Sequence, residues 1–130
     1  MGGNCLNAAI VLARFGVDVT IVTKFAKDYI ASQILNCLQT EGIDTNSIVY
    51  VNKPGMTTGF SYIIVDKSTK TRTVIHNPCE DLQDPSELPN FTSLLTNIDL
   101  LIIDGKHSNV SYRVFQINFI MINHLISLPI

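Results

Sequence analysis

The chain has 130 residues, of which 46% are hydrophobic and 15% charged, and its formal net charge at pH 7 is -2. A chain of this length can build one core, because proteins near this size bury roughly two-thirds of their extended surface on folding. A balanced charge without a basic stripe argues against nucleic acid as the main partner. A small neutral or anionic ligand fits the composition better.

The cysteines and the apolar segments bear on the compartment. Cys5, Cys37 and Cys79 are odd in number and form no Cys-x-x-Cys pair, which suits a reducing compartment and argues against a zinc site. The apolar stretch from Phe115 to Ile130 is shorter than the about 20 residues of a bilayer span and is interrupted by polar residues. No secretory leader pattern is present at the start. We expect a cytoplasmic protein without a membrane segment or a metal ion.

The first predicted element is a helix from Asn4 to Phe15. Its apolar residues recur at steps of three and four, and Gly16 is typical of a helix end. The pattern predicts a buried stripe made of Cys5, Ala8, Ala9, Leu12 and Phe15.

A glycine pair and two asparagines, Gly2-Gly3-Asn4-Cys5-Leu6-Asn7, surround the start of this helix. Glycines let a ligand approach the backbone, and a helix start offers unpaired N–H groups. Phosphate is one candidate ligand. However, the pattern lacks the Lys-Ser/Thr of a P-loop and the third glycine of a dinucleotide fingerprint, and two amides suit a polyol better. A helix cap without any ligand is the simplest explanation of these residues alone.

The next elements alternate between strand and helix. The residues from Val17 to Val22 predict a buried strand, which Thr23–Phe25 carries into a loop. A helix is expected from Lys27 to Gln39, capped near Asp28, and a short strand from Ile48 to Val51. The apolar face of the helix would hold Tyr29, Ile30, Ile34, Leu35 and Leu38.

The segment between Thr57 and Asn77 predicts a β-hairpin. Phe60–Val65 and Thr71–His76 are rich in β-branched and aromatic residues and flank a polar turn at Asp66–Lys70. A hairpin within an α/β alternation is an insertion or a flap, because parallel strands are joined by crossovers.

A buried strand is predicted from Ile98 to Asp104, after a polar surface loop. Asp104, Lys106 and His107 are candidate ligand contacts, because α/β proteins bind ligands at the carboxyl ends of parallel strands. A carboxylate at a strand end is more often a cap than an acid or base, so Asp104 is not our expected catalyst. The residues Ser111–Ser127 can be drawn as a helix, although their amphipathic order is poor.

Six segments in this order and spacing form a pattern. They are Gly2-Gly3-Asn4-x-x-Asn7-x-Ala9, Ala13-Arg14-Phe15-Gly16, Val22-x-Lys24 to Asp28, Leu38-x-x-Glu41-Gly42-Ile43-Asp44, Thr58-Gly59 and Lys70-Thr71-Arg72-Thr73. Taken together, they resemble the pfkB (ribokinase-like) carbohydrate kinases, nearest to ketohexokinase-like and plant-type members. The resemblance implies an α/β three-layer sandwich, present in part over residues 1–130, with a small β-sheet lid formed by a hairpin at about 57–77. It also implies phosphoryl transfer from ATP, with Mg²⁺, to a sugar or nucleoside hydroxyl.

Residue by residue, the resemblance implies sugar contacts for Gly3, Asn4 and Asn7 and a phosphate contact for Lys106. The family's first strand, catalytic aspartate, anion hole and adenine pocket are not recognised in these residues. We therefore expect the 130 residues alone to lack kinase activity. Two alternatives remain open, namely an interaction module that associates, for example as a homodimer, through its lid hairpin, and an unrelated α/β fragment. The residues do not choose between sugars and nucleosides.

Overall fold

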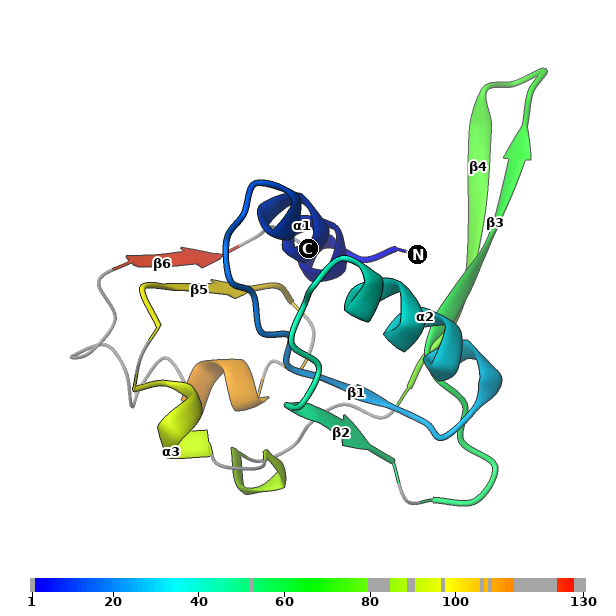
Figure 1. The fold of residues 1–130 in the computed structure, drawn as a ribbon. Helices are drawn as coiled ribbons and strands as arrows, with labels where there is room; N and C mark the ends of the chain where they lie inside the picture. The colour runs from blue at the N-terminus through cyan, green and yellow to red at the C-terminus, as the bar shows by residue number, and fades with distance from the viewer. Residues whose placement is uncertain are drawn as a thin grey trace.

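A computed structural model describes residues 2–51, 53–79, 85–88, 91–96, 98–105, 107, 109–113 and 124–127 (Figure 1). The helices are α1 (Asn4–Arg14), α2 (Tyr29–Thr40) and α3 (Phe91–Leu94), with a 3-10 turn, η1, at Pro85–Glu87. The strands are β1 (Thr23–Phe25), β2 (Ile48–Tyr50), β3 (Phe60–Asp66), β4 (Thr71–Asn77), β5 (Leu100–Ile103) and β6 (His124–Ser127). They form the parallel pairs β1–β2 and β5–β6 and the antiparallel hairpin β3–β4.

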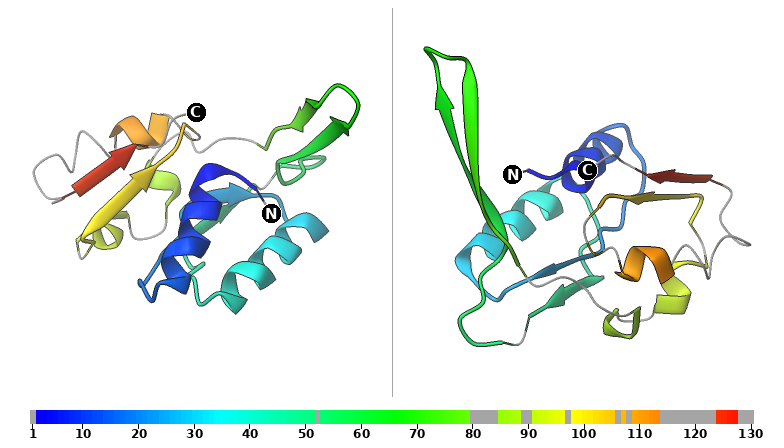
Figure 2. Two further views of the ribbon diagram at one scale, coloured as in Figure 1. Left: turned by 90° about the horizontal axis from the view of Figure 1, so that it is seen from above. Right: turned by 180° about the vertical axis from the view of Figure 1, so that it is seen from behind.

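Two apolar clusters lie on opposite sides of the β1–β2 pair. Ile48 packs into the first cluster, with Phe25, Ala9 of α1 and Leu38 of α2. The next residue along the strand, Val49, packs against the second cluster, which consists of Leu88, Leu95 and Val110. Successive side chains of a strand point to opposite faces, so helical segments cover both faces of these strands. The views from above and behind show α1 and α2 side by side on one face (Figure 2). The predicted α/β sandwich is confirmed.

The predicted helix at the start of the chain is confirmed as α1, but its buried face was assigned in part wrongly. Gly16 follows the helix with a φ of 81°, a conformation that favours glycine. Phe15, which the periodicity placed on the buried stripe, is the C-cap residue and is 82% exposed. The cap residue leaves the helical path, so the helical spacing no longer determines its direction.

The prediction of a strand at Val17–Val22 was shifted along the chain. Val17 is 49% exposed, and the strand is the following triplet, Thr23–Phe25, which had been expected to be a loop. Thr20 contributes only an isolated bridge to Asp44. Because Lys24 is buried within the strand, hydropathy alone placed the strand too early.

Helix α2 begins where its capping residue predicts. Asp28 is the N-cap, and its side chain accepts a hydrogen bond from the Ala31 N–H at 2.8 Å. Ala31 and Leu38 are buried, whereas Tyr29, expected on the apolar face, is 76% exposed. Tyr29 is the first residue of the helix and lies beyond the edge of the core.

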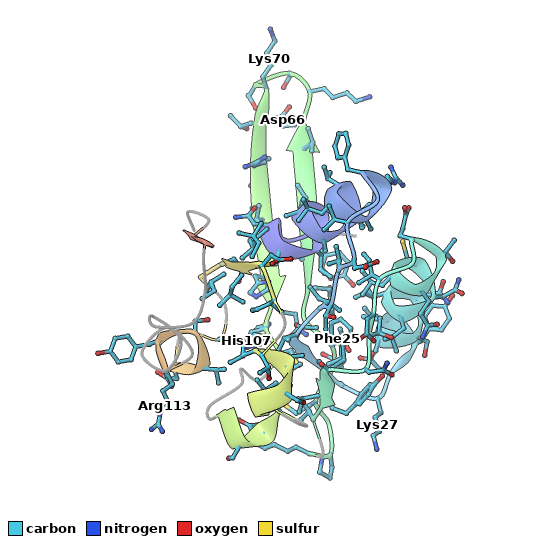
Figure 3. All side chains as sticks on the ribbon, turned by 60° about the vertical axis from the view of Figure 1, so that its left-hand side comes forward. Phe25, Lys27, Asp66, Lys70, His107 and Arg113 are labelled. Atoms are coloured by element: carbon cyan, nitrogen blue, oxygen red, sulfur yellow. The ribbon has the colours of Figure 1, made fainter. Side chains whose placement is uncertain are left out.

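The predicted hairpin is confirmed, with seven registered pairs from Phe60↔Asn77 to Asp66↔Thr71. It projects away from the rest of the described structure in all views (Figures 1 and 2). Asp66 and Lys70 lie at its tip, far from His107 (Figure 3). The turn is held by Asp66 Oδ1, which accepts hydrogen bonds from the Ser68 N–H and hydroxyl, and by Lys70 with a φ of 55°. The four bonds from Ser68 and Thr69 lower the pKa of Asp66 to about 2.

The last part of the chain differs from its prediction. β5 is half-buried rather than fully buried, and it pairs with β6, where residues 124–127 had been drawn as part of a helix. Residues 109–113 are helical. The rest of the predicted helix lies outside the described residues. Parallel pairing to β5 is a long-range interaction that helical periodicity could not indicate.

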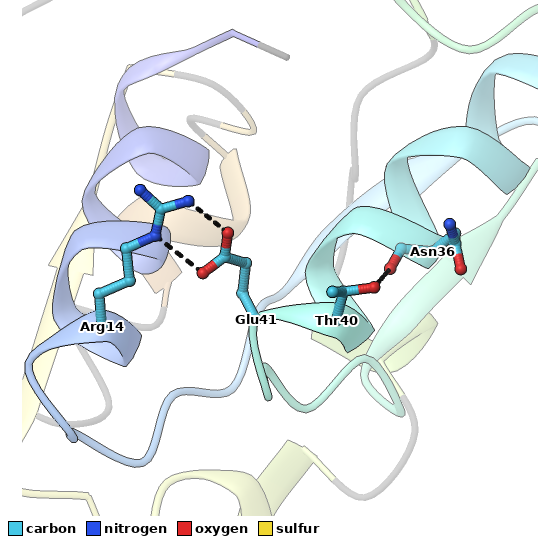
Figure 4. A network of polar contacts seen from close by, with 4 residues as sticks. All are labelled: Arg14, Asn36, Thr40 and Glu41. Atoms are coloured by element: carbon cyan, nitrogen blue, oxygen red, sulfur yellow. Dashed lines mark hydrogen bonds and ion pairs between the residues drawn. The ribbon is translucent and has the colours of Figure 1, made fainter.

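An exposed ion pair joins the C-terminal ends of α1 and α2. Arg14 Nε donates to Glu41 Oε2 at 2.8 Å, and the second guanidinium nitrogen bonds the other oxygen, so the pair is bidentate (Figure 4). In the last turn of α2, the Thr40 hydroxyl donates to the Asn36 carbonyl at 2.7 Å. Since the Arg14 side chain is 68% exposed, this pair contributes little to stability.

Candidate functional site

A cavity of about 800 Å³ lies where the start of α1, the β1 strand, the hairpin root and the end of β5 meet. Its volume is within the range of small-molecule sites. Most of the lining is apolar, with a few polar groups from different elements. The polar groups include the backbone of Gly2 and Gly3 before α1, Thr23 and Lys24 of β1, Gln33 of α2, Thr58, Ser61 and His76 of the hairpin and its root, and Asp104, His107 and Ser111 after β5.

The start of α1 faces the end of β5. Gly3 is the N-cap with a φ of 93° and supplies no capping side chain. Instead, the Cys5 N–H donates to Asp104 Oδ2 at 3.4 Å, and the Cys5 thiol contacts the Ile102 carbonyl at 3.8 Å. The carboxylate therefore compensates the positive end of the helix from another segment, as a cap would. Asp104 is thus a helix-capping group here, although it caps a helix earlier in the chain rather than the next segment.

The surroundings of Cys5 make its thiol unreactive. Burial, followed by the charge of Asp104 and a hydrogen bond to it, raises the pKa of Cys5 to about 11. None of Cys5, Cys37 and Cys79 forms a disulfide bond. The Cys5 side chain is thus a packing group.

The predicted sugar-binding residues are distributed unevenly around this cavity. Gly3 lines it, and its left-handed backbone leaves the helix start without a side chain in front of it. Asn4 and Asn7 are exposed residues of α1 and, among the described residues, are not part of the lining. Lys106, the predicted phosphate contact, lies outside the described residues.

His107 joins the two parallel pairs of strands near the cavity. Its Nε2 lies 3.5 Å from the Thr23 hydroxyl of β1, and its φ is 54°. A left-handed backbone is uncommon for a residue with a Cβ and is frequent at functional sites. The His107 imidazole therefore lines the cavity beside the first residue of β1, and it follows the last residue of β5 in the chain (Figure 3).

The hairpin root is fixed to α2 through Asp28. The Thr58 N–H donates to Asp28 Oδ2 at 2.7 Å and its hydroxyl lies 2.8 Å from Oδ1. The same hydroxyl accepts from the Ala26 N–H at 3.0 Å. Thr58 is 1% exposed, and the next residue, Gly59, is so close to Cys79 that a Cβ would lie 3.0 Å from its nitrogen.

Two polar features of the cavity were not predicted. Lys24, expected in a loop, is buried and forms a 2.7 Å ion pair with Glu87. Ser61 and His76 are opposite each other on the hairpin, with Oγ and Nδ1 2.9 Å apart. The contact between Ser61 and His76 could have been predicted from the register of the hairpin. The ion pair of Lys24 and Glu87 could not, because the two residues are 63 positions apart and no local pattern links them.

Among the residues that the structure describes, no group of three or more His, Cys, Asp or Glu side chains could hold a metal ion. In that part of the chain no helix has both the length and the hydropathy to cross a bilayer.

The fold is ribokinase-like. The model of the pfkB family of carbohydrate kinases matches residues 1–116, and the chain belongs to this family. The bifunctional ribokinase/ribose-5-phosphate isomerase A of Fructilactobacillus sanfranciscensis is 28% identical over 101 residues. This match covers 78% of our chain and 18% of the relative.

Solved structures agree on the fold. An uncharacterized sugar kinase from Pyrococcus horikoshii in complex with ATP superposes with a TM-score of 0.79 at 14% identity, covering 97% of our chain and 42% of that one. Fructokinase from Xylella fastidiosa superposes with a TM-score of 0.74 at 15% identity, and the match covers 88% of our chain and 37% of the fructokinase. The chain thus spans about two-fifths of the kinases that it superposes on and less than a fifth of the curated relative above.

Proposed function

We propose that this chain forms the sugar-binding and lid-bearing part of an ATP-dependent carbohydrate kinase. The supporting observation is the cavity that the glycine-started helix α1 shares with the end of β5 and the root of the hairpin. Its substrate would be a sugar or nucleoside with several hydroxyls. The relatives named above are sugar kinases, and one was solved with ATP.

In this proposal the start of α1 holds the substrate. Gly3 lets a hydroxyl in the cavity reach the backbone, and Asn4 and Asn7 of α1, which lie outside the cavity lining, offer amides that both donate and accept. Asn7 lies one helical turn after Gly3, because its N–H bonds the Gly3 carbonyl at 3.1 Å. Lys106 would contact the transferred phosphate as a point charge.

A binding measurement tests this role. Purified chain is titrated with D-ribose, D-fructose and adenosine while its melting temperature is recorded. We expect one of them to raise it. Asn7→Ala should reduce the shift, whereas Asn36→Ala, on the exposed part of α2, should leave it unchanged. If no compound stabilises the chain, or if Asn7→Ala responds like the parent, the proposed site is wrong.

Catalysis by these residues alone is not expected. Phosphoryl transfer needs a base for the hydroxyl and groups that stabilise the transferred charge, and ATP with Mg²⁺ supplies the phosphoryl group. We assign no residue of this chain to the base or to the ATP site. Incubation with ATP, Mg²⁺ and each sugar should therefore form no ADP above background, with a full-length ribokinase assayed in parallel. ADP formation that depends on the sugar would contradict this expectation.

A second function, association through the hairpin, is favoured by its exposed apolar side chains. Six large ones are more than half exposed, and a hairpin edge can accept another strand. Its partner would be a second copy of the chain, as a homodimer. Light scattering should then give twice the monomer mass, and Ile64→Lys should restore the monomer. The six residues are Tyr62, Ile63, Ile64, Val65, Val74 and Ile75.

Three cysteines that form no disulfide favour the cytoplasm as the compartment. Fractionation of cells that make the native chain would test this placement.

A further inference from the structure

The hairpin root carries a polar pair that the proposed contacts of α1 do not include. Ser61 of β3 and His76 of β4 are direct partners in the ladder, with Oγ and Nδ1 2.9 Å apart. Both side chains are exposed, and both line the 800 Å³ cavity. The pair therefore reaches the same space as Gly3 from a different element.

The cavity-facing side of the hairpin changes from polar to apolar toward the tip. Ile63, two residues after Ser61, lies on the same face and also lines the cavity. Its ladder partner is Val74, so the pair after Ser61–His76 is apolar. A sugar has the matching character, because it presents hydroxyl groups along its edge and C–H groups on its faces.

The imidazole can serve a hydroxyl in either of its neutral forms. If the Ser61 hydroxyl donates to Nδ1, then Nε2 carries the hydrogen and donates to a ligand oxygen. If Nδ1 donates to Ser61 instead, Nε2 accepts from a ligand hydroxyl. A hydroxyl group can both donate and accept, whereas a phosphate oxygen suits only the first form. The pair therefore fits a neutral polyhydroxyl compound better than an anion.

We infer that Ser61 and His76 form a hydroxyl-binding element of the sugar site, with His76 Nε2 contacting the sugar and Ser61 as a positioning residue. The inference rests on the proposed function, because it places the same sugar between α1 and the hairpin. It also means that a bound sugar connects the hairpin to the rest of the fold.

The experiment is calorimetric titration of the purified chain with the best-binding compound among D-ribose, D-fructose and adenosine. His76→Phe keeps a ring and removes the polar atoms, and Ser61→Ala removes the orienting hydroxyl. Each should weaken binding about tenfold, as expected for one lost hydrogen bond of a desolvated ligand. The double variant should be little weaker than His76→Phe, because the two residues act as a unit. Ser61→Thr should retain affinity.

Thr73→Ala is the matched control, because Thr73 pairs with Ile64 on the opposite face of the same hairpin. If the parent binds sugar and His76→Phe binds equally well, the inference is wrong while the proposed function stands. If the parent binds none of the compounds, both are wrong. A measurement on the unsubstituted chain does not depend on whether the variants fold. Saturation with the sugar should shift the NMR resonances of the His76 ring, and unchanged resonances would overturn the inference.

Discussion

The carboxylate of Asp28 is shared between two elements, because it caps α2 through the Ala31 N–H and also binds both the N–H and the hydroxyl of Thr58. Burial of Asp28 opposes its ionisation, but the hydrogen bonds from Ala31 and Thr58 outweigh it and lower its pKa. One ionised group thus connects the start of a core helix to the root of the hairpin.

Loss of this carboxylate should destabilise the chain in a pH-dependent way. A lowered folded-state pKa gives stability that is present above the unfolded pKa of about 3.9 and is lost as the pH falls through the folded value. Asp28→Asn should cost about 1–2 kcal/mol at pH 7 and remove this part of the acid dependence. Urea unfolding at pH 7 and pH 3 measures both effects. Equal losses at the two pH values would contradict the prediction.

The hydroxyl of Thr58 can be tested separately from its packing. Thr58→Val keeps the shape but leaves the buried Ala26 N–H without its hydroxyl partner, which should cost about 1–3 kcal/mol. Thr58→Ser keeps the hydroxyl and should cost less. Amide exchange of the hairpin strands should quicken in the valine variant. Serine and valine variants of equal stability would show that the hydroxyl is not needed.

Gly59 is constrained by space. A Cβ there would lie 3.0 Å from the Cys79 nitrogen, so Gly59→Ala forces the two roots of the hairpin apart. We expect a loss of about 1–3 kcal/mol from overpacking. Gly2→Ala, where a Cβ meets open space, is the matched control. A Gly59→Ala chain as stable as Gly2→Ala would contradict the prediction.

Cys5 should resist alkylation in the folded chain. Burial first, and then Asp104, raise its pKa to about 11, so its thiolate fraction at pH 8 falls roughly a hundredfold below that of an ordinary thiol. Iodoacetamide followed by peptide mass spectrometry should show much slower modification of Cys5 in folded than in urea-unfolded chain. Asp104→Asn should quicken it. Equal rates in folded and unfolded chain would be inconsistent with the structure.

The Lys24–Glu87 pair should show strong coupling. The Lys24 side chain is 5% exposed, so Glu87→Gln leaves a buried ammonium with less compensation and should cost about 1–3 kcal/mol. Lys24→Met together with Glu87→Gln should cost less than the sum of the single changes. Chemical denaturation of the four chains gives the coupling energy. Additive losses would show that the contact is energetically neutral.

Local patterns predicted α1, α2 and the hairpin, because each has its own signal in adjacent residues, whereas α3 was not predicted. Asp28 indicated the start of α2, and the polar turn before Thr71 indicated the hairpin. Predictions failed where long-range pairing decides the structure. Lys24 joins a strand because Glu87 neutralises it, and residues 124–127 form a strand because β5 offers an edge.

The candidate site was predicted only in part for the same reason. Gly3 carries a backbone signature that sequence alone reveals, and it lines the cavity. The contact of Asp104 with Cys5 spans 99 residues of sequence, so the role of Asp104 at α1 could not be predicted from either segment. Ser61 and His76 belong to a hairpin that was predicted, yet its cavity-facing side depends on how its root is attached.

The seven-pair ladder of β3 and β4 makes the hairpin a stiff arm attached at one end. At about 3.4 Å per residue the arm is roughly 20 Å long, so a rotation of about 10° at its root would move its tip by roughly 3.5 Å. Ser61 and His76 near the pivot would barely move in such a swing, whereas the apolar side chains farther out would sweep through solvent. Sugar contacts at the root and partner contacts toward the tip can therefore be altered independently by substitution.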